Sequence, residues 1–320
     1  MRLCRFEHNS KPAVGFYLDT HVVPLESAQT AHAESTGKPL GLPNSDNLID
    51  FLPAGAANGP IKQLAVWVGE QGDLASVGAL ETSLVQLLVP VPRPNKLLLL
   101  AGNYAAHIEE GGQQAVDRAE TFPYVFMKPP TTTLQNPGAK VSLPSVSPEA
   151  IDYELELAVI MGRHAKGVSE SEALDYVAGY TVINDISDRR FRPNPDRRER
   201  PRDAFFDWMH GKWHDGFCPC GPCVVAADAV NDPQDMAMRL TVNGESRQDA
   251  STALQIFSVA AVIEFIASFV TLEPGDIIST GTSSGVGNAR GLFLQPGDMV
   301  SATIDGIGTL LTPIVGPNST

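Results

Sequence analysis

Short apolar runs that alternate with polar residues recur along most of the chain and predict β-strands. The first three lie between residues 2 and 25, in RLCRFE, AVGFYLD and HVVPL. Further strands are predicted in LLLLAGN, LEPGDIIST, LQPGDMVSAT and TLLTPIV, two of which contain a Pro-Gly-Asp turn. Many strands with few strand–helix–strand alternations favour an antiparallel or mixed sheet in an α+β fold.

Helical patterns are fewer. Ser169 and Glu172 form a capping-box spacing before apolar residues that end at Gly179, which predicts a helix through Ala178. The apolar stretch 254–272 contains Glu264 and predicts a buried helix. Residues 27–60 have little periodicity, so we expect irregular connections around one short helix near residues 48–52.

A proline-dense segment, VPVPRPNK at residues 89–96, divides the chain. Proline cannot donate a hydrogen bond to a sheet, so this segment predicts a boundary. The length of 320 residues exceeds that of a typical single core. We therefore expect a small α/β domain at residues 1–90 and a larger domain at residues 91–320.

Composition narrows the classes of function. Hydrophobic residues make up 43% and charged residues 19% of the chain, which is typical of a globular protein. The formal net charge of −14 disfavours a nucleic-acid partner, because phosphate backbones are repelled. No apolar run has the length of a signal peptide core or a membrane span. These features predict a cytoplasmic protein without a membrane partner.

Three of the four cysteines lie together in FCPCGPC, as Cys218, Cys220 and Cys223, and the fourth is Cys4. Close thiolates could hold zinc, with His214 as a further ligand. A structural zinc site usually uses two spaced pairs of ligands, and no second pair is present. We expect buried, reduced thiols in a Pro/Gly-rich turn.

Carboxylates accompany two of the most apolar strands. In IDYELELAVIMG, alternation places Glu154 and Glu156 on one face, and YTVINDIS carries Asp185 at its end. A solvated face would tolerate the glutamate pair, but buried carboxylates need a partner. Three oxygen donors suit Mg²⁺ or Mn²⁺. Pattern alone leaves both alternatives open.

Four blocks in consistent order resemble the fumarylacetoacetate hydrolase superfamily. They are DYELELAVIMG, DYVAGYTVINDISDR, GKWHDGFCPCGP and LEPGDIISTGT, and the resemblance covers residues 96–315. It implies a mixed β-roll in the larger, catalytic domain and a Mg²⁺ or Mn²⁺ ion held by Glu154, Glu156 and Asp185. It also implies a homodimer.

The segment GNYAAHIEE at residues 102–110 resembles the His-Glu element of the acylpyruvase-like members. The resemblance implies His107 as a general base and Glu110 as the residue that orients it. Residues three apart lie on one face of a helix, which suits such a dyad. Acids near a helix start are also common because of its dipole. Residues 109–120 are polar and rich in Gly and Gln, which predicts a lid.

The remaining site residues are implied by the resemblance alone. Lys212 matches a catalytic lysine, and Lys128, Arg189 and Thr282 match substrate-binding positions. Three features depart from the family pattern. Arg192 replaces a common glutamine, the Arg- and Pro-rich segment 189–208 is longer, and Ser283 replaces the proline after Thr-Gly-Thr.

The resemblance implies a hydrolase that cleaves a C–C bond in a small 2-oxo or β-diketo acid. The alternative is a decarboxylase, isomerase or dehydratase that acts on a 2-oxo acid through the same enolate. A third alternative, from another class, is a non-catalytic protein stabilised by its metal. The intact His107–Glu110 pair disfavours that third alternative.

Overall fold

A computed structural model describes residues 1–317 of the chain. The strands are β1 Arg2–His8, β2 Lys11–Tyr17, β3 His21–Pro24, β4 Leu80–Glu81, β5 Leu87–Leu88, β6 Leu97–Ala101, β7 Tyr124–Met127, β8 Leu134–Gln135, β9 Val141–Ser142, β10 Ile151–Asp152, β11 Leu155–Met161, β12 Val177–Asn184, β13 Ser187–Asp188, β14 Cys218–Ala226, β15 Ala237–Val242, β16 Glu245–Ser251, β17 Ile277–Thr282, β18 Met299–Ile304 and β19 Gly308–Val315. The helices are α1 Leu25–Thr36, α2 Asn58–Gly69, α3 Ala105–Glu110, α4 Pro130–Thr133, α5 Asp203–His210, α6 Val259–Phe269 and α7 Gly287–Arg290.

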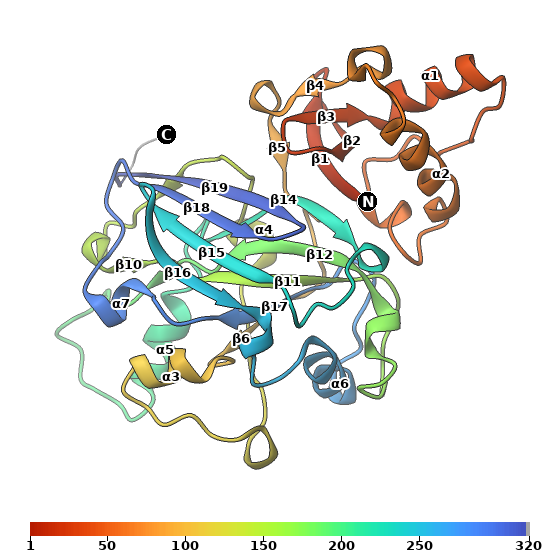
Figure 1. Cartoon of the computed structure of the whole chain (residues 1–320). Coiled ribbons are helices and arrows are strands. Elements are labelled where there is room, and N and C mark those ends of the chain that lie inside the picture. The colour runs from red at the N-terminus through yellow and green to blue at the C-terminus, as the bar shows by residue number, and fades with distance from the viewer. Residues whose placement is uncertain (318–320) are drawn as a thin grey trace.

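One large sheet runs through the molecule in the order β4-β3-β2-β1-β14-β12-β11-β17-β6-β7 (Figure 1). Most neighbouring strands are antiparallel, but β6 pairs in parallel with β17. The central strands β11 and β12 are buried along their whole length. Strands buried on both faces read as continuous apolar runs, as these two do. The predicted mixed sheet is therefore confirmed.

Alternation along β11 divides the core into two clusters. Leu157 and Val159 face a core shared with the second, five-stranded sheet β16-β15-β18-β19-β9 and with α6. Ala158 and Ile160 face a second core, which extends to α2 in the N-terminal part. The central strands thus lie between two apolar layers, and polar side chains near their ends are cut off from bulk water.

The first ninety residues form a lobe beside the main body (Figure 1). The large sheet nevertheless continues into this lobe, because β1 pairs with β14 through Arg2 opposite Val225 and Leu3 opposite Val224. The predicted division between residues 90 and 91 stays a prediction. None of the helices within residues 1–317 is long and apolar enough to cross a membrane.

Two local predictions were wrong. Ser169 and Glu172 do make capping-box contacts, with Ser169 Oγ donating to Glu172 at 2.6 Å. They initiate only a 3₁₀ turn, Ala173–Tyr176, and the following residues belong to β12. Sheet pairing of β12 with both β11 and β14 overrides the local helical pattern.

The second wrong prediction concerns residues 27–60, where α1 forms a regular helix. Only Leu25 and Ala28 of this helix are buried, so it carries almost no apolar periodicity. The short helix near residue 48 is confirmed as Leu48–Asp50, and the helix in residues 254–272 is confirmed as α6.

The cysteine cluster lies in strand β14 rather than in a turn. All four thiols are free and buried. Cys218 and Cys220 face one core, whereas Cys223 faces the other, so the three thiols do not converge. His214 lies instead within 3.3 Å of Asp188. Burial raises the pKa of Cys218 to about 12, which keeps this thiol protonated.

Replacing Gly179 with alanine should destabilise the fold by about 2–4 kcal/mol. A Cβ there would lie 2.4 Å from the carbonyl oxygen of Val225 and 2.5 Å from Val224 Cγ1, inside the central sheet. Chemical denaturation measures the effect, with Gly72→Ala as the control because its Cβ meets nothing within 4 Å. Equal stability of the two variants would contradict this account of the sheet.

Candidate metal centre and active site

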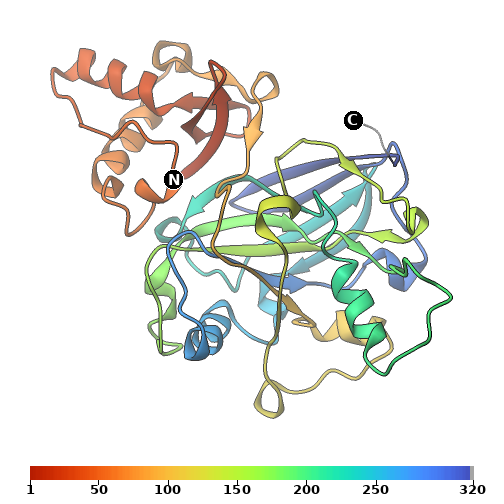
Figure 2. The same ribbon diagram turned by 180° about the vertical axis from the view of Figure 1, so that it is seen from behind.

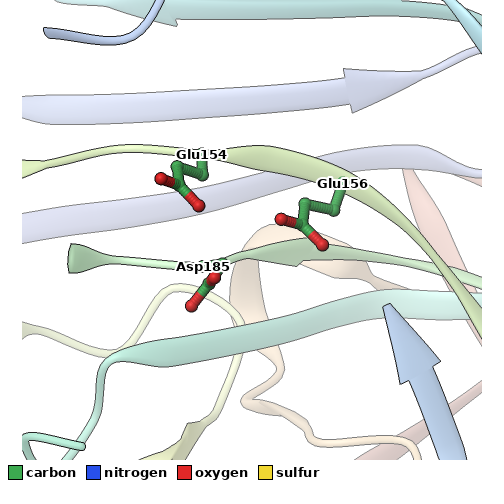
Figure 3. A group of neighbouring side chains, drawn as sticks. All are labelled: Glu154, Glu156 and Asp185. Carbon is green, nitrogen blue, oxygen red and sulfur yellow. The ribbon is translucent and has the colours of Figure 1, made fainter. Parts of the chain in front are cut away.

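The three predicted metal ligands converge at the ends of the central strands. Leu155 of β11 pairs with Asn184 of β12. Glu154 and Glu156 are the chain neighbours of Leu155, and Asp185 follows Asn184, so this pairing brings the three carboxylates together. The Asp185 N–H donates to the Glu154 carbonyl at 2.8 Å, which fixes the two segments to each other. One carboxylate oxygen from each of Glu154, Glu156 and Asp185 lies within 4.8 Å of the other two (Figure 3).

The hydrogen bonds of Glu156 indicate whether a cation fits the carboxylate cluster. Its Oε2 accepts hydrogen bonds from Ser279 Oγ at 2.6 Å and from the Gly281 N–H at 2.9 Å. Its Oε1 is buried and has no hydrogen-bond partner among residues 1–317. Burial, together with the negative charges of Asp185 and Glu154, raises the pKa of Glu156 to about 8. A buried oxygen left without a donor, beside two other carboxylates, fits a divalent cation.

Two cations surround the other ligands. Lys212 Nζ donates to Glu154 Oε2 at 2.8 Å and to Asp185 Oδ2 at 2.5 Å. Arg189 donates to Glu154 as well, and its Nε donates to Asp152 at 2.8 Å. Burial alone would raise the pKa of Glu154, but the charges of Lys212 and Arg189 outweigh burial and hold that pKa well below its usual range. Glu154 is therefore an anion at neutral pH.

Lys128 is buried and lies against Asp185 and two backbone carbonyl groups. Its Nζ donates to Asp185 Oδ1, to the Ile186 carbonyl at 3.1 Å and to the Phe217 carbonyl at 2.6 Å. These three contacts use all three N–H donors of an ammonium group. The contacts orient the Asp185 carboxylate toward the cluster.

Thr282 is also engaged by the protein. Its Oγ1 donates to the Leu155 carbonyl at 2.9 Å and accepts from Gln248 Nε2 at 2.8 Å. Gln248 in turn accepts from the Leu155 N–H at 2.9 Å. Leu155 lies between the two glutamates of the cluster, so Thr282 and Gln248 fix the backbone that carries them. Gln248 lies in the polar sequence ESRQDAS, which is typical of an exposed strand. The sequence alone therefore did not predict that Gln248 supports the site.

The His107–Glu110 pair lies on the short helix α3, which is side by side with α5 in both views (Figures 1 and 2). His107 Nδ1 lies 2.8 Å from Glu110 Oε1, and Glu110 Oε2 accepts from the Gly285 N–H at 2.8 Å. An ionised carboxylate can only accept, so Nδ1 carries the proton. In the neutral imidazole, Nε2 is then the basic nitrogen. When protonated, His107 also contributes, more weakly than Lys212 and Arg189, to the lowered pKa of Glu154.

Glu110→Gln should lower kcat by about a hundredfold or more, because the amide can donate to Nδ1 and favour the wrong tautomer. The amide oxygen can still accept from Gly285, so the loop contact survives. Steady-state kinetics and thermal unfolding check the prediction. A stable variant with unchanged kcat would remove Glu110 from the site.

A cavity of about 810 Å³ contains the dyad. Its lining residues are Ala101, Gly102, His107, Ile108, Glu110, Gly111, Gln113, Phe122, Pro123, Tyr124, Val125, Phe126, Arg189, Phe205, Trp208, Phe265, Phe269, Val286, Asn288 and Ala289. Arg189 is shared by the cavity and the carboxylate cluster. Lys212 Nζ lies 5.3 Å from the ring centre of Phe126 and 5.7 Å from that of Trp208, directly behind the cavity wall. The cavity and the cluster are therefore neighbours.

Asp152 is a site residue that the sequence interpretation missed. It is fully buried, accepts from the N–H groups of Gly287 at 2.6 Å and Asn288 at 3.0 Å, and holds Arg189. Asp152 could have been predicted from the sequence, because it lies two residues before Glu154 in IDYELE and alternation places both side chains on one face of a strand. By contrast, Arg192 is exposed, pairs with Glu199 and does not line the cavity.

Comparisons with known proteins agree with this geometry. The sequence profile described as "Fumarylacetoacetate (FAA) hydrolase C-terminal" matches residues 96–315. The oxaloacetate tautomerase YisK of Bacillus subtilis is 38% identical over 79% of this chain and 81% of its own. The 2,4-didehydro-3-deoxy-L-rhamnonate hydrolase of a Sphingomonas species is 36% identical over 84% of this chain and 89% of its own.

One similar solved structure contains bound ligands. Maleylpyruvate hydrolase from Sphingobium sp. SYK-6, in complex with manganese(II) and pyruvate, is 28% identical and superposes with a TM-score of 0.69 over 99% of this chain and 100% of its own. The relatives thus include both hydrolases and tautomerases. With two thirds of the chain matched by the family profile and an acidic cluster at its centre, the protein belongs to the fumarylacetoacetate hydrolase superfamily, a family of enzymes.

Proposed function

We propose that this chain is a divalent-metal-dependent hydrolase that cleaves a C–C bond in a small 2,4-dioxo acid of the acylpyruvate type. The observation that carries the proposal is a cavity that contains an oriented base and borders the carboxylate cluster through Arg189. His107 is held by Glu110 on one side of it, and Arg189, bonded to Glu154, lies at its border with the cluster. A base beside an acidic metal centre suits attack of water on a carbonyl.

Glu154, Glu156 and Asp185 are the proposed ligands of Mg²⁺ or Mn²⁺. The free Oε1 of Glu156 supports this assignment. When bound, such an ion acts as a Lewis acid toward the carboxylate and 2-oxo oxygens of the substrate. The manganese ion in the maleylpyruvate hydrolase structure supports the same class of cofactor.

The protein's own groups account for the proton transfers. His107 Nε2 takes a proton from water, and the resulting hydroxide adds to C4 of the substrate. The C3–C4 bond then breaks, the electron pair stays on C3, and the imidazolium returns its proton there. The products are pyruvate and the carboxylic acid of the acyl group, which releases its proton to solvent as the carboxylate forms. One molecule of water is consumed in each turnover.

Lys212 is the proposed donor to the oxygen that becomes negative on C4. Two of its three N–H groups donate to Glu154 and Asp185, which leaves the third for a substrate oxygen. Lys128 and Thr282, whose donors are engaged by the protein, are proposed to hold Asp185 and Leu155 in place rather than to touch substrate. Arg189 borders the cavity and is the remaining candidate for contact with a substrate carboxylate.

Keto–enol tautomerisation of a 2-oxo acid is the second candidate. The 38% identity to an oxaloacetate tautomerase favours it. His107 could move a proton to and from C3 without any water being consumed. Decarboxylation, isomerisation and dehydration use the same acidic C3 position, so the metal ligands do not separate these reactions.

A substrate panel tests the proposal. The Mn²⁺-loaded protein should convert acetylpyruvate to acetate and pyruvate, and this conversion should exceed its turnover of oxaloacetate or of a 2-keto-3-deoxy sugar acid. Rapid interconversion of oxaloacetate enol and ketone, with acetylpyruvate left intact, would favour the second candidate instead. The homodimer and the cytoplasmic location implied by the sequence stay predictions.

A further inference from the structure

The cavity beyond the dyad is walled by aromatic rings from separate parts of the chain. They come from three segments, which are residues 122–126 at the start of β7, α5 and α6: Phe122, Tyr124, Phe126, Phe205, Trp208, Phe265 and Phe269. Ring centres lie 5.0 Å apart for Phe126 and Trp208, and 6.0 Å apart for the stacked pair Phe122 and Phe265. The rings thus form two packed groups, one with Phe126 and Trp208 beside Lys212 and one around Phe122 and Phe265, and both groups line the same cavity.

Several of these rings remain exposed. The exposed fraction is 58% for Phe122, 63% for Tyr124, 55% for Phe205 and 58% for Phe269. Large apolar side chains gathered at one exposed place mark a binding site more often than chance. A cavity lined by aromatic rings with a few polar groups at one end is the usual form of a small-molecule site.

The charges of the cavity are all at one end. Among the lining residues, Arg189 and His107 alone can carry positive charge. Arg189 is paired with Asp152 and Glu154, and His107 is paired with Glu110. A second carboxylate on the substrate, placed among the aromatic rings, would lose its hydration and gain no cation in return.

We propose that the acyl group of the substrate, the part beyond C4, is an uncharged aromatic group that lies against this wall. The inference rests on the proposed function for the position of C4, and it deepens that function by naming the substrate class: aroylpyruvates rather than dicarboxylic acylpyruvates. A flat ring that stacks on Phe or Trp gains binding free energy beyond that of burying its apolar surface. The carboxylate end of the substrate then lies toward Arg189 and the carboxylate cluster.

Kinetics on two probes test the proposal. The kcat/KM of the Mn²⁺-loaded protein should be at least about tenfold higher for benzoylpyruvate than for fumarylpyruvate, because the second carboxylate finds no partner. A preference for fumarylpyruvate would overturn the aromatic assignment while leaving the hydrolase intact. If neither compound is cleaved, the proposed hydrolysis fails, and a binding measurement decides the present inference.

That measurement is calorimetry with phenylpyruvate and oxaloacetate, two 2-oxo acids that differ in the group on C3. Phenylpyruvate should bind the Mn²⁺-loaded protein at least about tenfold more tightly. Equal binding, or tighter binding of oxaloacetate, would overturn the inference whether or not the protein is a hydrolase.

Two neighbouring phenylalanines of α5 give a matched comparison. Phe205 lines the cavity, whereas Phe206 does not and is also exposed. Phe205→Ala should lower the ratio of kcat/KM for benzoylpyruvate over acetylpyruvate by about fivefold or more, and Phe206→Ala should leave that ratio unchanged. Phe269→Arg should shift preference toward fumarylpyruvate, since it adds the missing cation. A changed oligomeric mass with unchanged ratios would assign these rings to an interface and overturn the proposal.

Discussion

Replacing His107 with alanine should lower kcat for acetylpyruvate by about a thousandfold, because the base that takes the proton from water is lost. The substitution leaves Glu154, Glu156 and Asp185 in place. Manganese affinity, measured by calorimetry, should therefore change by less than about threefold. Steady-state kinetics at saturating manganese measure the loss of turnover.

The matched control is His164→Ala, an exposed histidine that does not line the cavity. This variant should keep wild-type kcat. Full activity of His107→Ala would remove the dyad from the mechanism. Loss of manganese binding in His107→Ala would instead show that the histidine acts on the metal centre and not on water.

The second large effect is expected for Glu156→Gln. The amide oxygen can still accept from Ser279 and Gly281, while the amide nitrogen takes the place of the unpartnered Oε1. Losing one anionic ligand should weaken manganese binding by more than about a hundredfold and abolish turnover. The metal-free variant should unfold at a higher temperature than the metal-free wild type, because the wild type must either hold a proton on Glu156 or bury a third like charge.

The higher unfolding temperature expected for metal-free Glu156→Gln should depend on pH in a definite direction. Burial beside Asp185 and Glu154, opposed by Lys212, raises the pKa of Glu156 from 4.5 to about 8. The folded metal-free protein therefore retains a proton that the unfolded chain releases, and its stability falls between about pH 4.5 and 8. Glutamine has no such titration, so the difference in unfolding temperature should grow across this window and then level off. A difference that shrinks with rising pH would contradict the assignment.

Most of the strands could be predicted because their signals are local. LEPGDIIST and LQPGDMVSAT combine a turn with an apolar run, and both became strands, β17 and β18. The helix predicted after Ser169 failed because Val177 and Gly179 have partners in β11 and β14. Those partners are distant in sequence, so the local pattern did not contain the deciding interaction.

Some residues of the candidate site could likewise be predicted from the sequence, and others could not. Glu154, Glu156 and Asp185 lie at neighbouring ends of β11 and β12. Alternation placed the two glutamates on one face, but the resemblance was needed to choose a metal site over a solvated face. The roles of Lys128 and Thr282 depend on contacts with Phe217 and Gln248, which no spacing predicts. The aromatic wall is assembled from three separate segments and becomes visible only once the chain is folded.

The central claim is that the oriented His107 activates water beside the carboxylate cluster for C–C cleavage. Turnover of acetylpyruvate by the Mn²⁺-loaded protein in H2¹⁸O, followed by mass spectrometry of the acetate, tests it most directly. We expect one solvent oxygen in each acetate formed, with one pyruvate released per acetate. Acetylpyruvate that is recovered intact, with no labelled acetate formed, would contradict it.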